Sequence, residues 1–150
     1  MINIFVRLVL TYVQKALGVQ AESGGQFMVP GFTTNSNYST LGATKYIIVR
    51  ATAANKADQA ISATASAILG VMQNAPDVGE AMSIAYAGRS KVVAGGSLSV
   101  NAIITTNGSG RAAAVTSGDI AIGRILEAAG ADGDVVSAVL FHPIRWQGAA

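Results

Sequence analysis

Short runs of β-branched and aromatic residues, interrupted at close intervals by turn-forming residues, constrain the fold of this chain more than any other feature. Each run has the length of a β-strand. No helical pattern long enough to connect parallel strands lies between the runs. We therefore predict a mainly β fold, a small β-barrel or β-sandwich-like domain over residues 44–146. The predicted strands cover residues 45–50, 68–72, 81–87, 91–94, 98–106, 111–115, 120–127 and 135–141.

Turn signals separate these runs. Asn107-Gly108 predicts a tight hairpin turn in which both central residues have positive φ. Asp132-Gly133 predicts a second tight turn. Residues 51–67 are rich in Ala, Ser and Thr, and we expect a loop or a short, weak helix there.

Residues 1–18 carry a different pattern. Apolar residues recur at helical spacing, and polar residues, among them Arg7 and Lys15, form one narrow stripe. This predicts an amphipathic helix that ends near Gly18 and needs a partner for its apolar face. A secretory signal or a membrane-surface anchor is the alternative, although Arg7 interrupts the apolar core that a signal requires. A membrane-spanning helix needs about 20 apolar residues and is not expected.

Residues 19–43 mix turn formers and β-formers without a period, and we expect an extended arm or long loop. Phe27, Val29, Phe32 and Tyr38 are apolar anchors spaced along it. Long irregular segments often bind partners. The four side chains would equally serve to pin the segment to the protein's own core, and both interpretations stay open. Residues 147–150 are expected to form a short tail.

The composition indicates a single domain that associates with other proteins. Of the 150 residues, 51% are hydrophobic and only 12% are charged, so the surface must be poor in charge. The formal net charge is +2, and Lys and Arg are scattered singly, which argues against a nucleic-acid partner. The chain has no cysteine, which excludes disulfides, thiolate nucleophiles and cysteine-based zinc sites.

The residues offer no constellation for catalysis. The single histidine, His142, precedes Pro143 and has no carboxylate near it in sequence. Gly108-Ser109-Gly110 lacks both the nucleophile-elbow spacing and the lysine of a phosphate-binding loop. Asp132-Gly133-Asp134 has too few oxygen ligands for an EF-type calcium loop, and a β-turn explains it. We therefore expect no enzyme activity, no cofactor and no metal.

Several short motifs occur in an order that suggests a family. They are Leu69-Gly70-Val71, Ala75-Pro76-Asp77-Val78-Gly79-Glu80, Val92-Val93-Ala94-Gly95-Gly96-Ser97-Leu98, Gly108-Ser109-Gly110-Arg111-Ala112, Ala121-Ile122-Gly123-Arg124-Ile125-Leu126-Glu127-Ala128-Ala129 and Gly133-Asp134-Val135-Val136. This order resembles the capsid cement, or head decoration, proteins of tailed bacteriophages. The resemblance covers about residues 44–141. Residues 1–43 depart from it, being longer and more hydrophobic than in that family.

The resemblance implies a structural role in the virion. A cement subunit binds the outer face of the phage head, often as a trimer, and bridges major capsid proteins without a reaction or a cofactor. The expected partners are therefore the major capsid protein and further copies of the chain. Trp146, near Phe141 and Arg145, is a further contact candidate, although it could equally fold back onto the domain. The candidate capsid- or subunit-contact residues are Ile2, Phe5, Val9, Val13, Phe27, Val29, Phe32, Tyr38 and Trp146.

A second class of function is a small-ligand or carbohydrate-binding β-barrel or β-clip module. Such a module predicts a concave pocket lined by aromatic side chains. Only 6% of the residues are aromatic, which favours the structural role.

Overall fold

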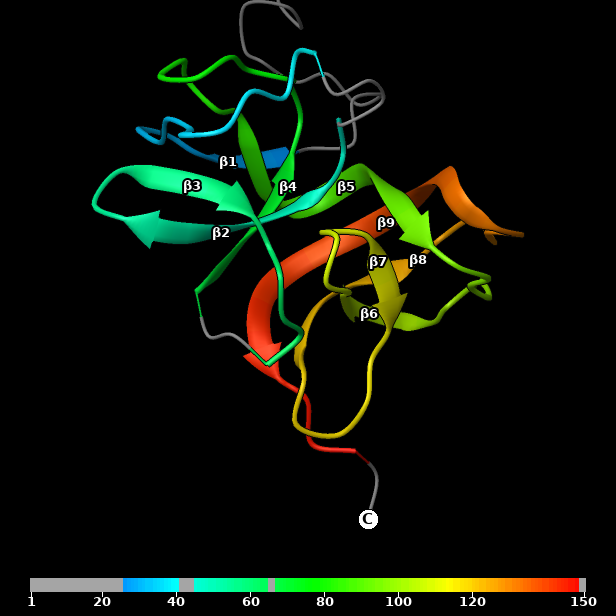
Figure 1. The fold of residues 1–150 in the computed structure, drawn as a ribbon. Helices are drawn as coiled ribbons and strands as arrows, with labels where there is room; N and C mark the ends of the chain where they lie inside the picture. The colour runs from blue at the N-terminus through cyan, green and yellow to red at the C-terminus, as the bar shows by residue number, and fades with distance from the viewer. Residues whose placement is uncertain (1–25, 41–44, 65–66, 149–150) are drawn as a thin grey trace, which may run out of the picture.

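The computed structural model describes residues 26–40, 45–64 and 67–148, and these are built from β-strands without a helix (Figure 1). The prediction of a mainly β fold is confirmed. The helix predicted for residues 1–18 lies outside the described residues. In the part of the chain that the structure describes, no helix could cross a membrane. The strands are β1 Gln26–Val29, β2 Ile48–Ala53, β3 Lys56–Gln59, β4 Ile68–Met72, β5 Ile84–Gly95, β6 Ile103–Thr106, β7 Ala112–Ala114, β8 Ile120–Ile125 and β9 Asp132–Arg145.

The strands form one sheet in the order β3-β2-β4-β5-β7-β6-β8-β9, with β1 also paired to β5. A further antiparallel pairing joins β5 to β9, from Gly88 opposite Leu140 to Gly95 opposite Asp132. This pairing closes β5, β7, β6, β8 and β9 into a hydrogen-bonded ring. Figure 1 shows the long, curved β9 running beside β5 and β8.

The long strand β5 joins the ring to the rest of the sheet. Its first residues, Ile84 and Ala85, pair with both β4 and β1, and its later residues pair with β9. The change of partners occurs near Gly88, which has a φ of 88° that a glycine adopts without strain. The two strands predicted over residues 81–87 and 91–94 are therefore one strand.

Apolar side chains on the two faces of β2, β4 and β5 fill two separate core clusters. Ile48 of β2 and Val71 of β4 belong to the cluster that fills the ring, whereas Val49 and Met72 belong to the other. All four are fully buried. Because successive side chains of a strand point to opposite faces, a strand that is buried on both sides has a continuous apolar sequence. The second cluster lies between these strands and residues 26–40.

The prediction of a loop or weak helix over residues 51–67 is wrong for residues 51–59, which form a β-hairpin, whereas residues 60–64 do form a loop. β2 extends to Ala53 and forms a hairpin with β3, and Asn55 in the turn has a φ of 56°. The segment contains few large apolar residues, so its local pattern is weak. The hairpin is held by long-range pairing, since Ala57 N–H donates to the carbonyl oxygen of Thr33 at 3.0 Å. Conversely, Tyr46 has a φ of 69°, and the strand predicted from residue 45 begins only at residue 48.

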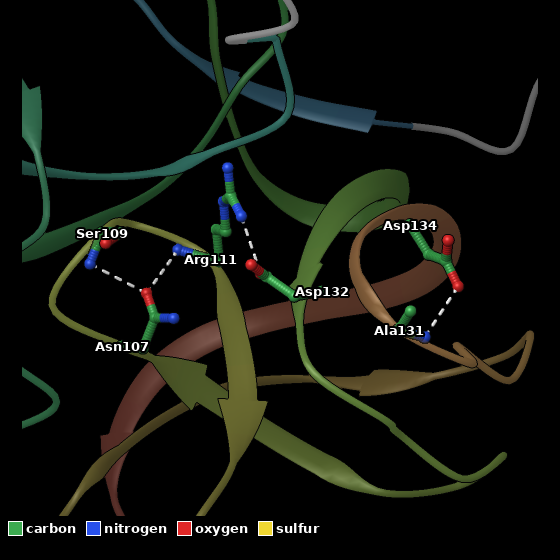
Figure 2. Close-up of polar contacts among 6 residues, drawn as sticks. All are labelled: Asn107, Ser109, Arg111, Ala131, Asp132 and Asp134. Carbon is green, nitrogen blue, oxygen red and sulfur yellow. Dashed lines mark hydrogen bonds and ion pairs between the residues drawn. The ribbon is translucent and has the colours of Figure 1, made fainter.

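The hairpin predicted at Asn107-Gly108 exists between β6 and β7, but its turn differs from the predicted type. Positive φ occurs at Gly110, at 70°, and not at the predicted dipeptide. The Asn107 side-chain oxygen accepts hydrogen bonds from the N–H groups of Ser109, at 2.9 Å, and Arg111, at 3.0 Å (Figure 2). An Asx-type turn therefore closes this hairpin, with a longer loop than the sequence pattern implies.

Residues 26–40 are more ordered than the predicted arm. Gln26–Val29 is strand β1, antiparallel to β5, so the prediction of an irregular segment is wrong there. Further along, Thr34 is fully buried, and its hydroxyl donates to a carboxylate oxygen of Asp58 at 2.7 Å. Tyr38 is 4% exposed and lies in the second core cluster. The segment thus packs on the protein's own sheet.

Candidate interaction surface

The residues considered for metal binding or catalysis have structural partners. Asp132 forms an ion pair with Arg111 at 2.7 Å, while Asp134 accepts hydrogen bonds from the N–H groups of Gly130 and Ala131. Figure 2 shows Asp132 directed toward Arg111 and Asp134 directed toward the N–H of Ala131. His142 is exposed on β9. Within the described residues, no three His, Cys, Asp or Glu side chains form a group that could hold a metal ion.

The predicted contact residues differ in accessibility. Phe27 is 62% exposed on β1, and its ring lies 6.3 Å from that of Tyr86. Val29 and Phe32 are half-buried against the second core cluster. Tyr38, buried in that cluster, offers a partner almost no surface. Ile2, Phe5, Val9 and Val13 lie outside the described residues.

Trp146 is half-buried at the end of β9. Its N–H donates to the carbonyl oxygen of Asp119 at 2.7 Å, and its own carbonyl oxygen accepts from Gly118 at 2.8 Å. The backbone of this residue is therefore fixed against the turn that precedes β8, while part of its side chain stays accessible.

Beside β1, two hollows have largely apolar walls. One, of about 480 Å³, is lined by residues of β1 and the segments after it, including Met28, Phe32 and Met82. The other, of about 240 Å³, includes Leu69 of β4 and Tyr86 of β5. Together with exposed Phe27 and Met28, the hollows make an apolar surface, which we call the β1 surface.

The outer face of the ring carries a second surface that the sequence analysis missed. Along β9, Val136, Ala138 and Leu140 point inward and are buried, whereas Val135 and Val139 are 48% and 36% exposed. The sequence describes this run as apolar on both faces. A strand with apolar residues on both faces is either buried on both sides or leaves one apolar face without a partner. The apolar run of residues 135–141 could therefore have indicated this surface.

Two arginines flank Val139 across the sheet. Arg89 of β5 and Arg124 of β8 are its direct cross-strand neighbours, and both are exposed. Exposed Leu126 follows β8, and its N–H donates to the carbonyl oxygen of Ser137. We call the exposed residues Arg89, Arg124, Leu126, Val135 and Val139 the ring face. It combines arginine with apolar side chains, a composition enriched in protein interfaces.

A small polar network borders the ring face. Lys91 Nζ donates to Ser137 Oγ at 2.9 Å and lies 3.4 Å from Glu127 Oε2. The same carboxylate oxygen accepts the backbone N–H of Ser137 at 3.2 Å. The hydrogen bond from Ser137 and the neighbouring Lys91 ammonium lower the pKa of Glu127 below its usual value. The carboxylate therefore stays ionised and bridges β5 to β9.

A polar hollow of about 280 Å³ opens next to this network. It is lined by Gln26, Arg89, Ser90, Lys91 and Ser137. Gln26 Nε2 donates to the carbonyl oxygen of Arg89 at 2.9 Å and holds β1 against the rim. The cationic side chains of Arg89 and Lys91 suit this hollow to a carboxylate from a partner, while the Ser90 hydroxyl already donates to the carbonyl oxygen of Lys91.

An acidic turn projects from the connection between β4 and β5. Asp77 and Glu80 flank Val78, which is 62% exposed, and Gly79, which has a φ of 83°. An added Cβ at Gly79 would meet no atom within 4 Å, so the tip stands in open space. Figure 1 shows this connection, in green, on the other side of the view from β8.

Comparison with known proteins identifies a shared fold. No protein-family model matches the sequence, and neither does any curated protein. Among solved structures, the head fiber gp8.5 N base of bacteriophage phi29 is similar, with a TM-score of 0.54 and 19% sequence identity. The match covers 80% of this chain and 100% of that chain. This chain therefore has the fold of a phage head fiber base.

Proposed function

We propose that this protein is a structural subunit of a tailed-phage head, a cement protein built on a small barrel-like β domain. The observation that carries the proposal is the fold shared with the phi29 head fiber base, which spans all of that chain. The order of sequence motifs over residues 44–141 supports the same class of protein independently. In this role the subunit binds the outer face of the shell through the major capsid protein, and it assembles as a homotrimer.

The mechanism is thermodynamic linkage. A subunit that binds only the assembled shell stabilises that shell in proportion to its occupancy and affinity. Several contacts on one lattice add avidity, because the second contact of a tethered assembly forms at high effective concentration. Neither effect needs a reacting group.

The β1 surface supplies the proposed contact with the coat protein. Phe27 and Met28 are 62% and 42% exposed on a short strand, with the apolar hollow of about 480 Å³ beside them. Burial of such side chains contributes about 25 cal/mol per Å² of apolar surface, from which the entropic and desolvation costs of association are subtracted. In this role Phe27, Val29 and Phe32 form the outer rim of the contact, and Tyr38 supports it from the core. The sequence pattern alone puts forward Ile2, Phe5, Val9 and Val13, outside the described residues, as further contacts with the coat protein or a neighbouring subunit.

Head binding tests the proposal directly. The full chain is mixed with purified heads of its phage from which the protein has been removed, and the heads are sedimented. We expect the protein to pellet with the heads and to raise the temperature at which they rupture. Phe27→Asp should reduce the pelleted fraction at least tenfold, whereas Val100→Asp, which charges an exposed valine elsewhere, should not. Failure of the unaltered protein to bind these heads would refute the proposal.

The alternative ligand-binding role makes a different prediction. It requires a pocket with several aromatic walls, yet Phe32 and Tyr86 lie in separate hollows. Binding to immobilised glycans, with no binding to heads, would favour this alternative.

A further inference from the structure

We infer that the acidic turn of one copy of this protein docks on the ring face of the next copy. This contact deepens the proposed function, since it names the surfaces through which a homo-oligomer would form. The occupant of the ring face is residues 76–81 of a second copy, with Val78 at the tip of the turn.

The ring face has unmatched positive charge. Among the described residues, neither Arg89 nor Arg124 forms an ion pair. Lys91 adds a third cation at the border of the ring face. It forms an ion pair with Glu127. A complementary partner would bring carboxylates to Arg89 and Arg124 and an apolar side chain to Val139, which lies between them.

The acidic turn has the complementary composition. Asp77 precedes and Glu80 closely follows exposed Val78 in the sequence, and each carboxylate already accepts one hydrogen bond within its own subunit. In the proposed contact Val78 meets Val139, while the carboxylates, which can accept further hydrogen bonds, meet the two arginines. The polar hollow of about 280 Å³ beside Arg89 is several times the volume of about 30 Å³ that one water occupies. It thus has room for a carboxylate side chain.

Hydrogen bonds within the subunit hold the turn in one conformation. The N–H of Glu80 donates to the carbonyl oxygen of Asp77 at 3.0 Å, and the N–H of Asp77 donates to Glu80 Oε2 at 2.9 Å. Gly79 N–H also donates to the carbonyl oxygen of Thr34 at 2.8 Å. Ser39 donates a hydrogen bond to the Asp77 carboxylate. A preorganised turn loses little conformational entropy on docking.

The geometry of the contact determines the type of assembly. The turn and the ring face are different surfaces, so each copy gives one turn and receives one. Such head-to-tail contacts close into a ring when the rotation between copies allows it. A cyclic homotrimer is one assembly of this kind.

The experiment measures the mass of the full chain by light scattering over a dilution series. Arg124→Glu reverses a charge on the ring face, and Lys45→Glu is the matched control at an exposed lysine. We expect Arg124→Glu to weaken assembly at least tenfold and Lys45→Glu to leave it unchanged, with equal circular dichroism and melting temperature. A monomeric unaltered protein, or equal assembly of the two variants, would overturn the inference.

Mixing two defective variants tests the head-to-tail arrangement. The second variant, Val78→Lys with Glu80→Gln, removes one of the two carboxylates and places a cation at the tip, but keeps an acceptor for the Asp77 N–H. Arg124→Glu keeps the acidic turn unaltered, and the second variant keeps the ring face unaltered. An equimolar mixture should therefore form heterodimers, although each variant alone is monomeric. Absence of heterodimers would contradict the proposed contact.

Head sedimentation separates this inference from the proposed function. If Arg124→Glu assembles normally but no longer binds heads, the coat protein occupies the ring face and the inference fails alone. If the unaltered protein forms the predicted oligomer but does not bind heads, the proposed function fails alone.

Discussion

The hydroxyl oxygen of Tyr38 accepts a hydrogen bond of 2.8 Å from the backbone N–H of Gln59, which joins residues 26–40 to the edge strand β3. The Tyr38 side chain is only 4% exposed, and burial raises the pKa of its hydroxyl above the usual value. The hydroxyl is therefore uncharged and forms a hydrogen bond within the core. This hydrogen bond joins residues 26–40 to the domain, so the segment is not a free arm.

Removing this hydrogen bond should destabilise the whole domain. We expect Tyr38→Phe to lower the free energy of unfolding by about 1–3 kcal/mol, because the part-buried N–H of Gln59 loses its acceptor. Tyr38→Ala should lower it by about 3–5 kcal/mol, because a cavity opens in the core. Urea denaturation measures both, with Val100→Ala, at an exposed site, as the control. If residues 26–40 formed a detached arm, neither Tyr38 variant would change the unfolding transition.

The Asn107 turn should depend on its side-chain acceptor. Asn107→Ala removes two hydrogen bonds to backbone N–H groups, so we expect a loss of about 1–3 kcal/mol in unfolding free energy. Asn107→Asp keeps an oxygen acceptor in the same place and should retain most of the stability. Thermal unfolding compares the two variants. Equal melting temperatures for Asn107→Ala and the unaltered protein would show that the backbone alone holds the turn.

Gly70 allows β4 to lie close to β5. A Cβ atom at this position would be 2.2 Å from the carbonyl oxygen of Ala85, and backbone atoms cannot move away cheaply. We expect Gly70→Ala to cost at least about 1–3 kcal/mol, the usual penalty of overpacking. Gly96→Ala is the matched control, since a Cβ there meets no atom within 4 Å. Chemical denaturation of both variants gives the comparison, and similar midpoints would contradict the close approach.

The Glu127 carboxylate should make stability depend on pH. Its pKa in the folded protein lies below the ordinary value of 4.5, so its contribution is complete above about pH 4.5. The contribution is lost as the pH falls through the folded pKa. Glu127→Gln should therefore be less stable than the unaltered protein at pH 7, and the difference should shrink at pH 3. Urea denaturation at the two pH values measures this, and a difference independent of pH would show that ionisation is not involved.

Local sequence patterns determined the class of the fold. The predicted run 120–127 overlaps β8, and the predicted run 135–141 lies within the longer β9. Alternation of side chains and high β-propensity act within a few residues, so they locate a strand better than its ends. The hairpin at Asn107 was predictable for the same reason, since a turn depends on its own residues.

Tertiary structure decided what the local pattern left open. Residues 26–29 and 56–59 have weak patterns, and they became strands because β5 and β2 offered them backbone partners. The ring face arose in the same way: Val139 lies between Arg89 and Arg124 only because β5, β9 and β8 are neighbours in the sheet. The sequence by itself determined which side chains alternate along each strand. Only the pairing of distant strands decided which of them meet, because register is a property of two segments and is encoded in neither alone.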